Sequence, residues 1–140
     1  MKNIKMIISY DGGNYIGWQL QATGDTIQGV IEAALGQILN RHTRVIGSGR
    51  TDAGVHALNQ VAHFVTDSTL DLASLHRGLN RLLPRDIVIK EMVEVSPDFH
   101  ARYSARSRIY QYLVWNNRVR SPFYRRFSWQ VREHLDSDAM

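Results

Sequence analysis

The sequence has no cysteine among its 140 residues, which excludes disulfide bonds and metal sites built from thiolates. It also lacks any apolar run near the roughly 18 residues that a membrane-spanning helix needs. No internal repeat or low-complexity stretch stands out. Hydrophobic residues still make up 44% of the chain, which suffices for a packed core and argues against disorder. We therefore expect a soluble globular protein of the reducing cytoplasm, without membrane contact.

Acidic residues are scarce in the last part of the chain, and the positive charge collects there. Residues 1–97 hold nine basic and nine acidic residues, whereas residues 98–140 hold eight basic and four acidic ones. Guanidinium groups grip phosphates, and aromatic rings stack on unstacked bases. This composition favours RNA binding, with a solvated basic face as the alternative. All eight basic residues are arginines, namely Arg102, Arg106, Arg108, Arg118, Arg120, Arg125, Arg126 and Arg132, and eight aromatic residues are interleaved with them.

The order of the expected secondary-structure elements indicates a ferredoxin-like fold. Apolar residues alternate or cluster in four short runs typical of strands, and they recur at helical spacing in two longer runs. Asp25 or Thr26 can cap the first helix, and Pro84 ends the second. The resulting β-α-β-β-α-β order predicts an α+β domain in which two helices cover one face of an antiparallel sheet. Strands are expected at residues 4–10, 43–46, 60–65 and 86–95, and helices at residues 27–40 and 72–83.

A joint between two domains is expected at residues 96–98, where the sequence is Ser-Pro-Asp. The first domain would then be residues 1–97. Residues 98–140 would begin a second, basic α+β domain that the chain does not complete. Within it, residues 109–115 predict another strand with Tyr110 and Tyr112 on one face, and residues 136–140 resemble the opening of a helix.

The least ordinary stretch is residues 47–57, Gly-Ser-Gly-Arg-Thr-Asp-Ala-Gly-Val-His-Ala. Three glycines in eight residues permit backbone conformations and close approaches that side chains would block. Arg50 stands two positions before Asp52, and a nearby guanidinium favours the ionised form of a carboxylate. An ionised, oriented carboxylate can act as a nucleophile or a general base. From local spacing alone, an Arg50–Asp52 ion pair that merely closes a turn fits equally well.

Other classes of site fit this stretch poorly. A phosphate-binding P-loop would need Gly-Lys-Ser/Thr after its glycines. Asp52 occupies the position where a dinucleotide-binding fingerprint has its third glycine. An aspartic protease loop would place its aspartate first and would have a second copy elsewhere. His56 and His63 could suggest a metal pair, but there are no cysteines or clustered acids around them, so no metal site is expected.

The stretch from Gly49 to His56 resembles the signature loop of the tRNA pseudouridine synthase A family. The resemblance spans nearly all 140 residues and keeps the family's order. The family's first motif is similar to Tyr10-Asp11-Gly12, Tyr15 and Gly17-Trp18-Gln19. Further similarities lie at Gln60, His63-Phe64, Leu79-Asn80, Pro84, Asp86-Ile87, Phe99-His100-Ala101-Arg102, Ala105, Arg108, Tyr110 and Tyr112.

The resemblance also implies roles for individual residues. Asp52 matches the catalytic aspartate, which either attacks C1′ of the target uridine or abstracts its C2′ proton. Arg50 matches the arginine that pairs with this aspartate and holds the target nucleotide out of the helix. Tyr110 matches the tyrosine that stacks on the uracil, and Arg102 matches an arginine that contacts RNA or the active-site loop. The reaction has no redox step, so no cofactor is expected.

For the whole protein, the resemblance implies a homodimeric isomerase that converts uridine to pseudouridine in the anticodon stem-loop of tRNA, at the tRNA positions named 38 to 40. Members of the family are roughly twice as long as this chain, so we expect the chain alone to be weakly active or inactive. Two other classes stay open. A non-catalytic RNA-binding module would bind RNA in a salt-sensitive manner without needing Asp52. A dimerisation fragment would ignore RNA.

Overall fold

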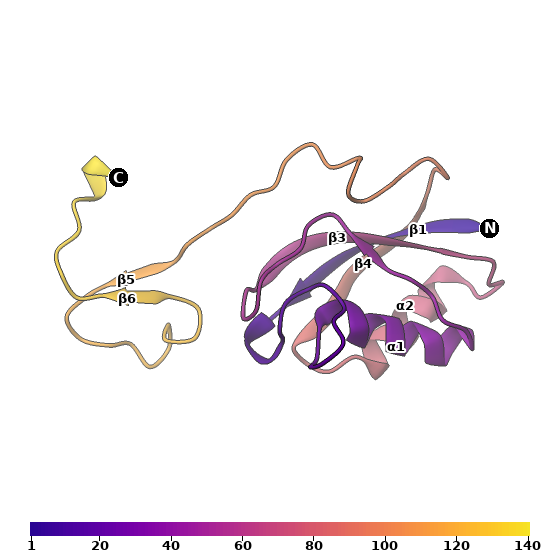
Figure 1. Ribbon diagram of the computed structural model, residues 1–140, viewed down its shortest axis with the longest axis horizontal. Coiled ribbons are helices and arrows are strands. Elements are labelled where there is room, and N and C mark those ends of the chain that lie inside the picture. The colour runs from indigo at the N-terminus through magenta and orange to yellow at the C-terminus, as the bar shows by residue number, and fades with distance from the viewer. The chain divides into compact units, whose positions relative to one another are not determined.

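The computed structural model describes residues 1–140, which form two compact units, residues 1–106 and 107–140. The first unit contains four strands and two α-helices in the order β1-α1-β2-β3-α2-β4 (Figure 1). This confirms the predicted α+β order. The elements are β1 (Lys2–Tyr10), a 3-10 helix (Gly12–Asn14), α1 (Ile27–Leu39), β2 (Ile46–Gly47), β3 (Ala57–Thr66), α2 (Leu72–Leu82) and β4 (Ile87–Val95).

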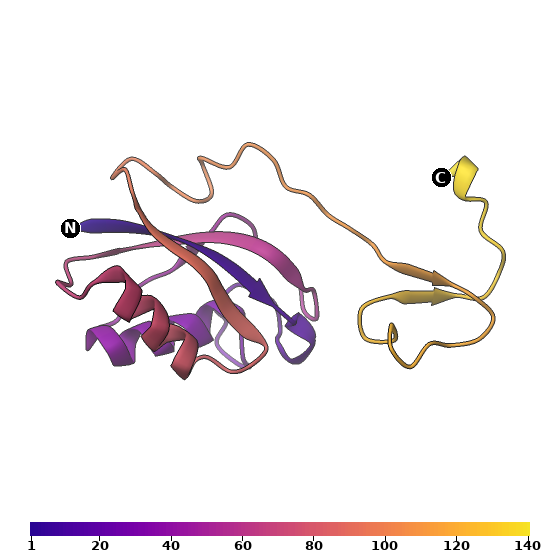
Figure 2. The same cartoon turned by 180° about the vertical axis from the view of Figure 1, so that it is seen from behind.

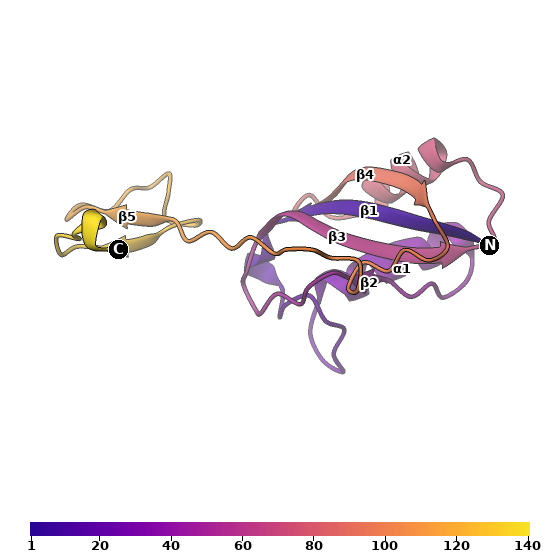
Figure 3. The ribbon, with the colours of Figure 1, turned by 90° about the horizontal axis from the view of Figure 1, so that it is seen from above.

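The sheet has the strand order β2-β3-β1-β4, and all neighbouring strands are antiparallel. Both helices cover one face of this sheet, as Figure 2 shows. The opposite face, called the open face below, is the one seen from above in Figure 3. The predicted ferredoxin-like arrangement is therefore confirmed.

The core lies between the sheet and the two helices. Because side chains alternate along a strand, every second residue of the central strand β1 from Ile4 onward points toward the helices, and these residues are at most 4% exposed. Thr26 caps α1 by accepting a hydrogen bond from Gly29 N at 3.1 Å, so it is Thr26 of the two candidates that serves as the cap. The buried apolar residues of β1 are Ile4, Met6, Ile8 and Tyr10, and they pack with Ile27, Ile31, Leu35, Leu75 and Leu79 of the helices.

The second strand is shorter than expected, because only Ile46 and Gly47 pair with β3. The reason lies in the buried polar side chains of α1. Val45 donates its backbone N–H to Glu32 Oε1 at 2.8 Å, and its carbonyl accepts from Gln28 Nε2 at 3.1 Å. Since α1 satisfies both backbone groups of Val45, the strand expected from residue 43 begins at residue 46.

The second unit contains two short strands, β5 (Val114–Asn116) and β6 (Trp129–Val131), paired in parallel. Most of the strand expected over residues 109–115 is therefore absent, and its first five residues are exposed and lie outside any strand. A 3-10 helix (Ser137–Ala139) stands where the opening of a helix was expected. Neither unit has a helix with the length and apolar character that crossing a membrane requires.

Candidate active site

The connection between β2 and β3, residues 48–56, is called the Asp52 loop below. It lies at the end of the sheet where β1 finishes, since Tyr10 pairs with Ala57 on one side and with Ile87 on the other. The residues that follow β1 are therefore its neighbours. Hydrogen bonds from these residues and from β3 hold the loop at its start, in its middle and near its end.

The start of the loop is fixed by the side chain of Gln60 in β3, which is 8% exposed. Gln60 Nε2 donates to Gly49 O at 2.7 Å, and its Oε1 accepts from Ser48 Oγ at 2.9 Å. Ser48 also donates its backbone N–H to Val61 O at 2.7 Å. The chain therefore leaves the sheet in a defined direction before it reaches Asp52.

The middle of the loop is held at Thr51, the residue before Asp52. Its Oγ1 lies 2.8 Å from the hydroxyl oxygen of Tyr10, and its carbonyl accepts from Trp18 N at 3.0 Å. Burial raises the pKa of Tyr10, so its phenol keeps its proton at neutral pH. Trp18 is only 2% exposed, and its ring lies against Gly47, just before the loop. The backbone that carries Asp52 is thus attached to the core.

The end of the loop turns back toward the residues after β1. Val55 N donates to Asp52 O at 3.2 Å, and Gly54 N donates to Tyr15 O at 3.1 Å. Gly54 has a φ of 78°, in the left-handed region that favours glycine. His56 Nδ1 lies 3.0 Å from Gly12 N. Asp52 therefore stands in a tight turn that is tied to a second loop.

The two loops approach each other so closely that glycine is required. A Cβ added to Gly12 would lie 2.0 Å from Val55 O, and one added to Gly17 would lie 2.7 Å from Thr51 O. Gly17 also has a φ of 102°, which a side chain would strain. Within the motif itself, a Cβ added to Gly47 would lie 2.6 Å from the ring of Trp18. The close approach predicted for the glycines of the motif is therefore found at Gly47, and the two glycines of the preceding loop add further ones.

A second set of polar contacts holds the loop that follows β1. Asp86 lies just before β4, and its carboxylate accepts a hydrogen bond from Tyr15 Oη at 2.6 Å. Its backbone carbonyl accepts a hydrogen bond from Asp11 N at 2.9 Å. Asp11 Oδ1 lies 3.0 Å from His56 Nδ1. Neutral His56 can accept from Gly12 N, whereas protonated His56 can donate to Asp11. His56 therefore joins the two loops in either protonation state.

Arg50 and Asp52 are both exposed, and no ion pair within 4.0 Å joins them. The alternative that their pairing merely closes the turn does not apply to this structure, because other groups shape the turn. The pairing that the resemblance implies is not formed here either. What the arrangement offers chemically is a solvent-accessible carboxylate on a firmly held backbone.

The other predicted site residues lie elsewhere. Arg102 belongs to the first unit, is exposed, and follows Ala101, which is buried against the open face. Tyr110 belongs to the second unit, where its side chain is 73% exposed and lies outside any strand. Only Arg50 and Asp52 are thus brought together in one loop. All eight arginines of residues 98–140 are exposed.

The supporting roles of Tyr10, Tyr15 and Gln60 were not foreseen from the sequence. Each lies in a stretch that resembles a family motif, but its contact with the Asp52 loop joins residues far apart in the chain, 41 positions in the case of Tyr10 and Thr51. The motif could have marked these residues as important, but only the fold shows what they hold.

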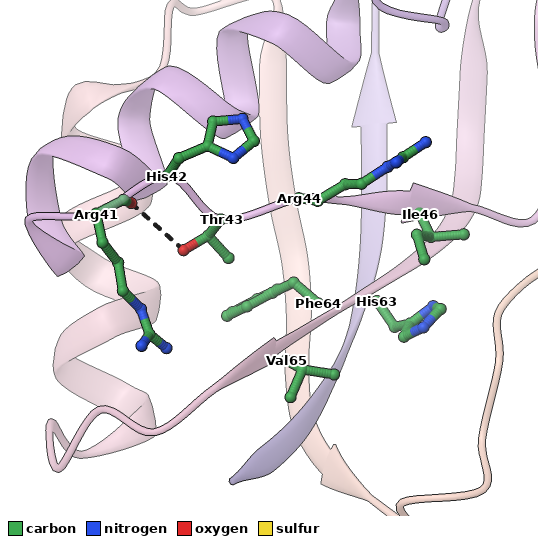
Figure 4. Close-up of a pocket in the computed structure, with 8 residues that line it drawn as sticks. All are labelled: Arg41, His42, Thr43, Arg44, Ile46, His63, Phe64 and Val65. Atoms are coloured by element: carbon green, nitrogen blue, oxygen red, sulfur yellow. Dashed lines mark hydrogen bonds between the residues drawn. The ribbon is translucent and has the colours of Figure 1, made fainter.

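A pocket of about 320 Å³ lies along the edge of β3, beside residues 41–46 (Figure 4). None of the residues that line it belongs to the Asp52 loop. Arg41, one of its basic residues, is already paired with Asp67 at 2.7 Å. The pocket is therefore separate from the site described above. The structure has no group of three or more His, Asp or Glu side chains placed to hold a metal ion.

Comparison with known proteins identifies close relatives. Residues 6–104 match the family model described as tRNA pseudouridine synthase. The chain is 50% identical to the tRNA pseudouridine synthase A of Pelobacter propionicus over 140 residues, which are 100% of this chain and 57% of that protein. Identity is 46% to the proteins of the same name from Syntrophotalea carbinolica and Acetivibrio thermocellus, of which 56% and 57% are covered. The chain thus spans somewhat more than half the length of these relatives.

Proposed function

Because this chain belongs to the tRNA pseudouridine synthase family, we propose that it supplies the catalytic aspartate, Asp52, of an enzyme that isomerises uridine to pseudouridine in tRNA. The observation that carries the proposal is the exposed carboxylate of Asp52 on a loop fixed at its start, middle and end. An enzyme that must act on one atom of a flipped nucleotide needs such a firmly positioned group.

The reaction breaks the bond between C1′ of the ribose and N1 of the uracil, turns the base, and rejoins C1′ to C5. The C5 proton leaves and a proton is bound at N1, so substrate and product are isomers. Asp52 can open this sequence in two ways. Its carboxylate attacks C1′ and displaces the base, or it removes the C2′ proton to give a glycal. Both routes require an ionised carboxylate that the ribose can reach.

The substrate has to be drawn out of its stack before Asp52 can reach it. We assign this holding role to Arg50, which shares the loop with Asp52, and to Tyr110, whose ring would stack on the uracil. Arg102 and the other exposed arginines would contact phosphates. The choice of the anticodon stem-loop as target rests on the resemblance of the motifs, and so does the homodimeric state.

A non-catalytic role in RNA binding is the second candidate. It is favoured by the exposure of all eight arginines of residues 98–140 together with aromatic side chains, among them Tyr103, Tyr112 and Phe123 at 78%, 91% and 85%. Exposed arginines and aromatic side chains of this kind can bind RNA whether or not Asp52 acts on it. The relatives are longer than this chain, so the proposed activity concerns the whole protein.

The test is tritium release from tRNA labelled at C5 of its uracils. It uses the chain itself and a chimera in which the chain is continued by the remaining residues of the Pelobacter propionicus relative. We expect release by the chimera, little or none by the chain alone, and loss of release in the Asp52→Asn chimera. Asp138→Asn, which removes an exposed carboxylate in the second unit, is the matched control and should retain release.

Each outcome separates the two candidates. Release that depends on Asp52 supports the synthase. A folded chimera that binds tRNA but releases no tritium supports the RNA-binding module instead. Release that persists in Asp52→Asn would rule out Asp52 as the catalytic group.

A further inference from the structure

Residues 96–104 form a segment that lies on the open face of the sheet after the end of β4 (Figure 3). The side chain of Asn3 in β1 holds its beginning. Asn3 Nδ2 donates to Ser96 O at 3.0 Å and to Phe99 O at 2.8 Å, and the side chain is almost fully buried. The segment is therefore part of the first unit, which continues to Arg106.

His63 in β3 holds the middle of the segment. Its Nδ1 accepts a hydrogen bond from Ala101 N at 3.1 Å. The ring centroids of Phe99 and His100 lie 5.8 and 4.8 Å from that of His63, both in edge-to-face geometry. His63 is 4% exposed and Ala101 is 2% exposed. One buried imidazole is thus the polar anchor at the centre of the segment.

The bond from Ala101 requires that Nδ1 of His63 carries no proton, since an acceptor needs a free lone pair. Burial lowers the pKa of His63, and the neighbouring His100 lowers it further. The charged and titratable groups that face His63 are Lys5 on β1, Arg41, His42 and Arg44 beside the same pocket, and His100 of the segment. Of these groups, His100 lowers the pKa of His63, whereas a hydrogen bond to the backbone of Ile46 opposes the shift without reversing it.

We propose that neutral His63 is a positioning residue for Arg102, because it anchors the 96–104 segment to the sheet and so sets the point from which Arg102 reaches the RNA. Arg102 follows the anchored Ala101 directly, and its side chain is exposed. The evidence for the anchoring is the set of contacts that His63 makes with Phe99, His100 and Ala101. The contact between Arg102 and RNA rests on the function proposed above.

The anchoring has a defined pH dependence. A detached His63 has a pKa of about 6.5, whereas the anchored form has a lower one. Between these values only the detached form takes up a proton. The attachment is therefore at full strength above about pH 6.5 and weakens as the pH falls toward the lower, anchored value.

The first test is amide hydrogen exchange at Ala101, measured by NMR at about pH 7.5 and about pH 5.5 and corrected for the intrinsic rate. In the wild-type chain we expect protection at the higher pH and partial loss of it at the lower. His63→Leu should exchange roughly tenfold faster or more at both, because the acceptor is gone. His63→Asn should stay protected at both, because its Oδ1 can accept the same bond and does not titrate.

His76→Asn is the matched control, because it alters another histidine that contacts a backbone carbonyl, Ile89 O at 2.6 Å, on the helix side. It should leave Ala101 exchange unchanged. The anchoring is overturned if His63→Leu exchanges like the wild type while β1 and β3 amides stay protected, or if His63→Asn keeps the wild-type pH dependence. If His63→Leu does not fold, wild type and His63→Asn decide the question.

A double-mutant cycle of tRNA affinity then tests the link to Arg102. His63→Leu and Arg102→Ala should each weaken binding, and the double variant should bind no more weakly than Arg102→Ala alone. Additive effects of the two substitutions would overturn the positioning role. If the wild-type chain bound no tRNA, the RNA contact of Arg102 would fall together with the proposed function, while the exchange rates would still decide the anchoring.

Discussion

The hydroxyl oxygen of Tyr10 lies 2.8 Å from Oγ1 of Thr51 and links the last residue of β1 to the residue before Asp52. Both partners come from stretches that are 41 positions apart in the chain. Because Tyr10 is buried in the core at 4% exposure, this contact transmits the rigidity of the central strand to the loop that carries the proposed catalytic carboxylate.

Tyr10→Phe keeps the ring in the core and removes this hydrogen bond. We expect the free energy of unfolding to fall by about 1 kcal/mol, the usual net value of one such bond. In the chimera, tritium release should slow while tRNA affinity is kept, since the loop that carries Asp52 is loosened. Urea denaturation measures the first effect. Tyr103→Phe, which removes a hydroxyl from a side chain that is 78% exposed, should leave the free energy of unfolding unchanged. Equal stability of Tyr10→Phe and the wild type would contradict the linking role.

Gly12→Ala tests the close contact of the two loops. The new methyl group would lie 2.0 Å from Val55 O, so the Asp52 loop has to move, at a cost of about 1–3 kcal/mol in stability. Gly36→Ala in α1 is the matched control, because its new methyl would meet nothing closer than 3.6 Å. Alanine is favoured over glycine inside a helix by about 1 kcal/mol, so this control should gain stability. The two substitutions should shift the urea midpoint in opposite directions, and a shift of the same sign would refute the argument.

The helices and long strands could be predicted because their signals are local. The apolar spacing of α1 and α2 and the alternation of β1 are written in consecutive residues. The strand expected over residues 43–46 begins only at Ile46, because both backbone groups of Val45 bind Gln28 and Glu32 of α1. The apolar periodicity of the sequence does not reveal such a contact.

In the candidate site, too, features that depend on neighbouring residues could be predicted, whereas contacts between distant residues could not. The sequence predicts Asp52 and Arg50 as site residues because they stand in one short motif. It could not show that they would be unpaired, nor that Gly12 and Gly17 would press against the Asp52 loop. Those features depend on where the fold places two loops that are distant in sequence.

Tyr15 gives the stability of the first unit a pH dependence in alkaline solution. Burial raises the pKa of Tyr15, and the hydrogen bond to Asp86 and the charge of that carboxylate raise it further. The folded state therefore holds this proton more tightly than the unfolded state, whose tyrosines titrate near about pH 10. The contribution of Tyr15 is fully present below about pH 10 and is lost as the pH rises above it.

Tyr15→Phe should accordingly be less stable than the wild type at neutral pH, and the difference should shrink as the pH rises above about 10. Thermal unfolding of both proteins across this range measures the effect, because the two chains differ only at position 15. Tyr103→Phe should run parallel to the wild type throughout. A difference between Tyr15→Phe and the wild type that stays constant with pH would show that the proton of Tyr15 does not contribute.

The exposed arginines of the second unit should make RNA binding sensitive to salt. Each guanidinium that neutralises a phosphate releases condensed counterions, so the logarithm of the binding constant falls linearly with the logarithm of the salt concentration. Arg118, Arg120 and Arg125 are all exposed. When any one of these arginines is changed to alanine, we expect weaker tRNA binding. The steepness of the salt dependence should also fall, by about 0.7 to 0.9 for every phosphate that the protein no longer neutralises.

The matched control for these substitutions is Arg77→Ala. Arg77 is an exposed arginine of α2, on the helix-covered side of the first unit, where it donates to Ser74 Oγ at 2.9 Å. Filter binding of tRNA over a series of salt concentrations should show an unchanged slope for Arg77→Ala and reduced slopes for the arginines of the second unit. If all four variants kept the wild-type slope, the positive charge of the second unit would not serve phosphate binding. If Arg77→Ala lowered the slope as much as the others, the attraction would be a general effect of net charge, because no single surface would then account for it.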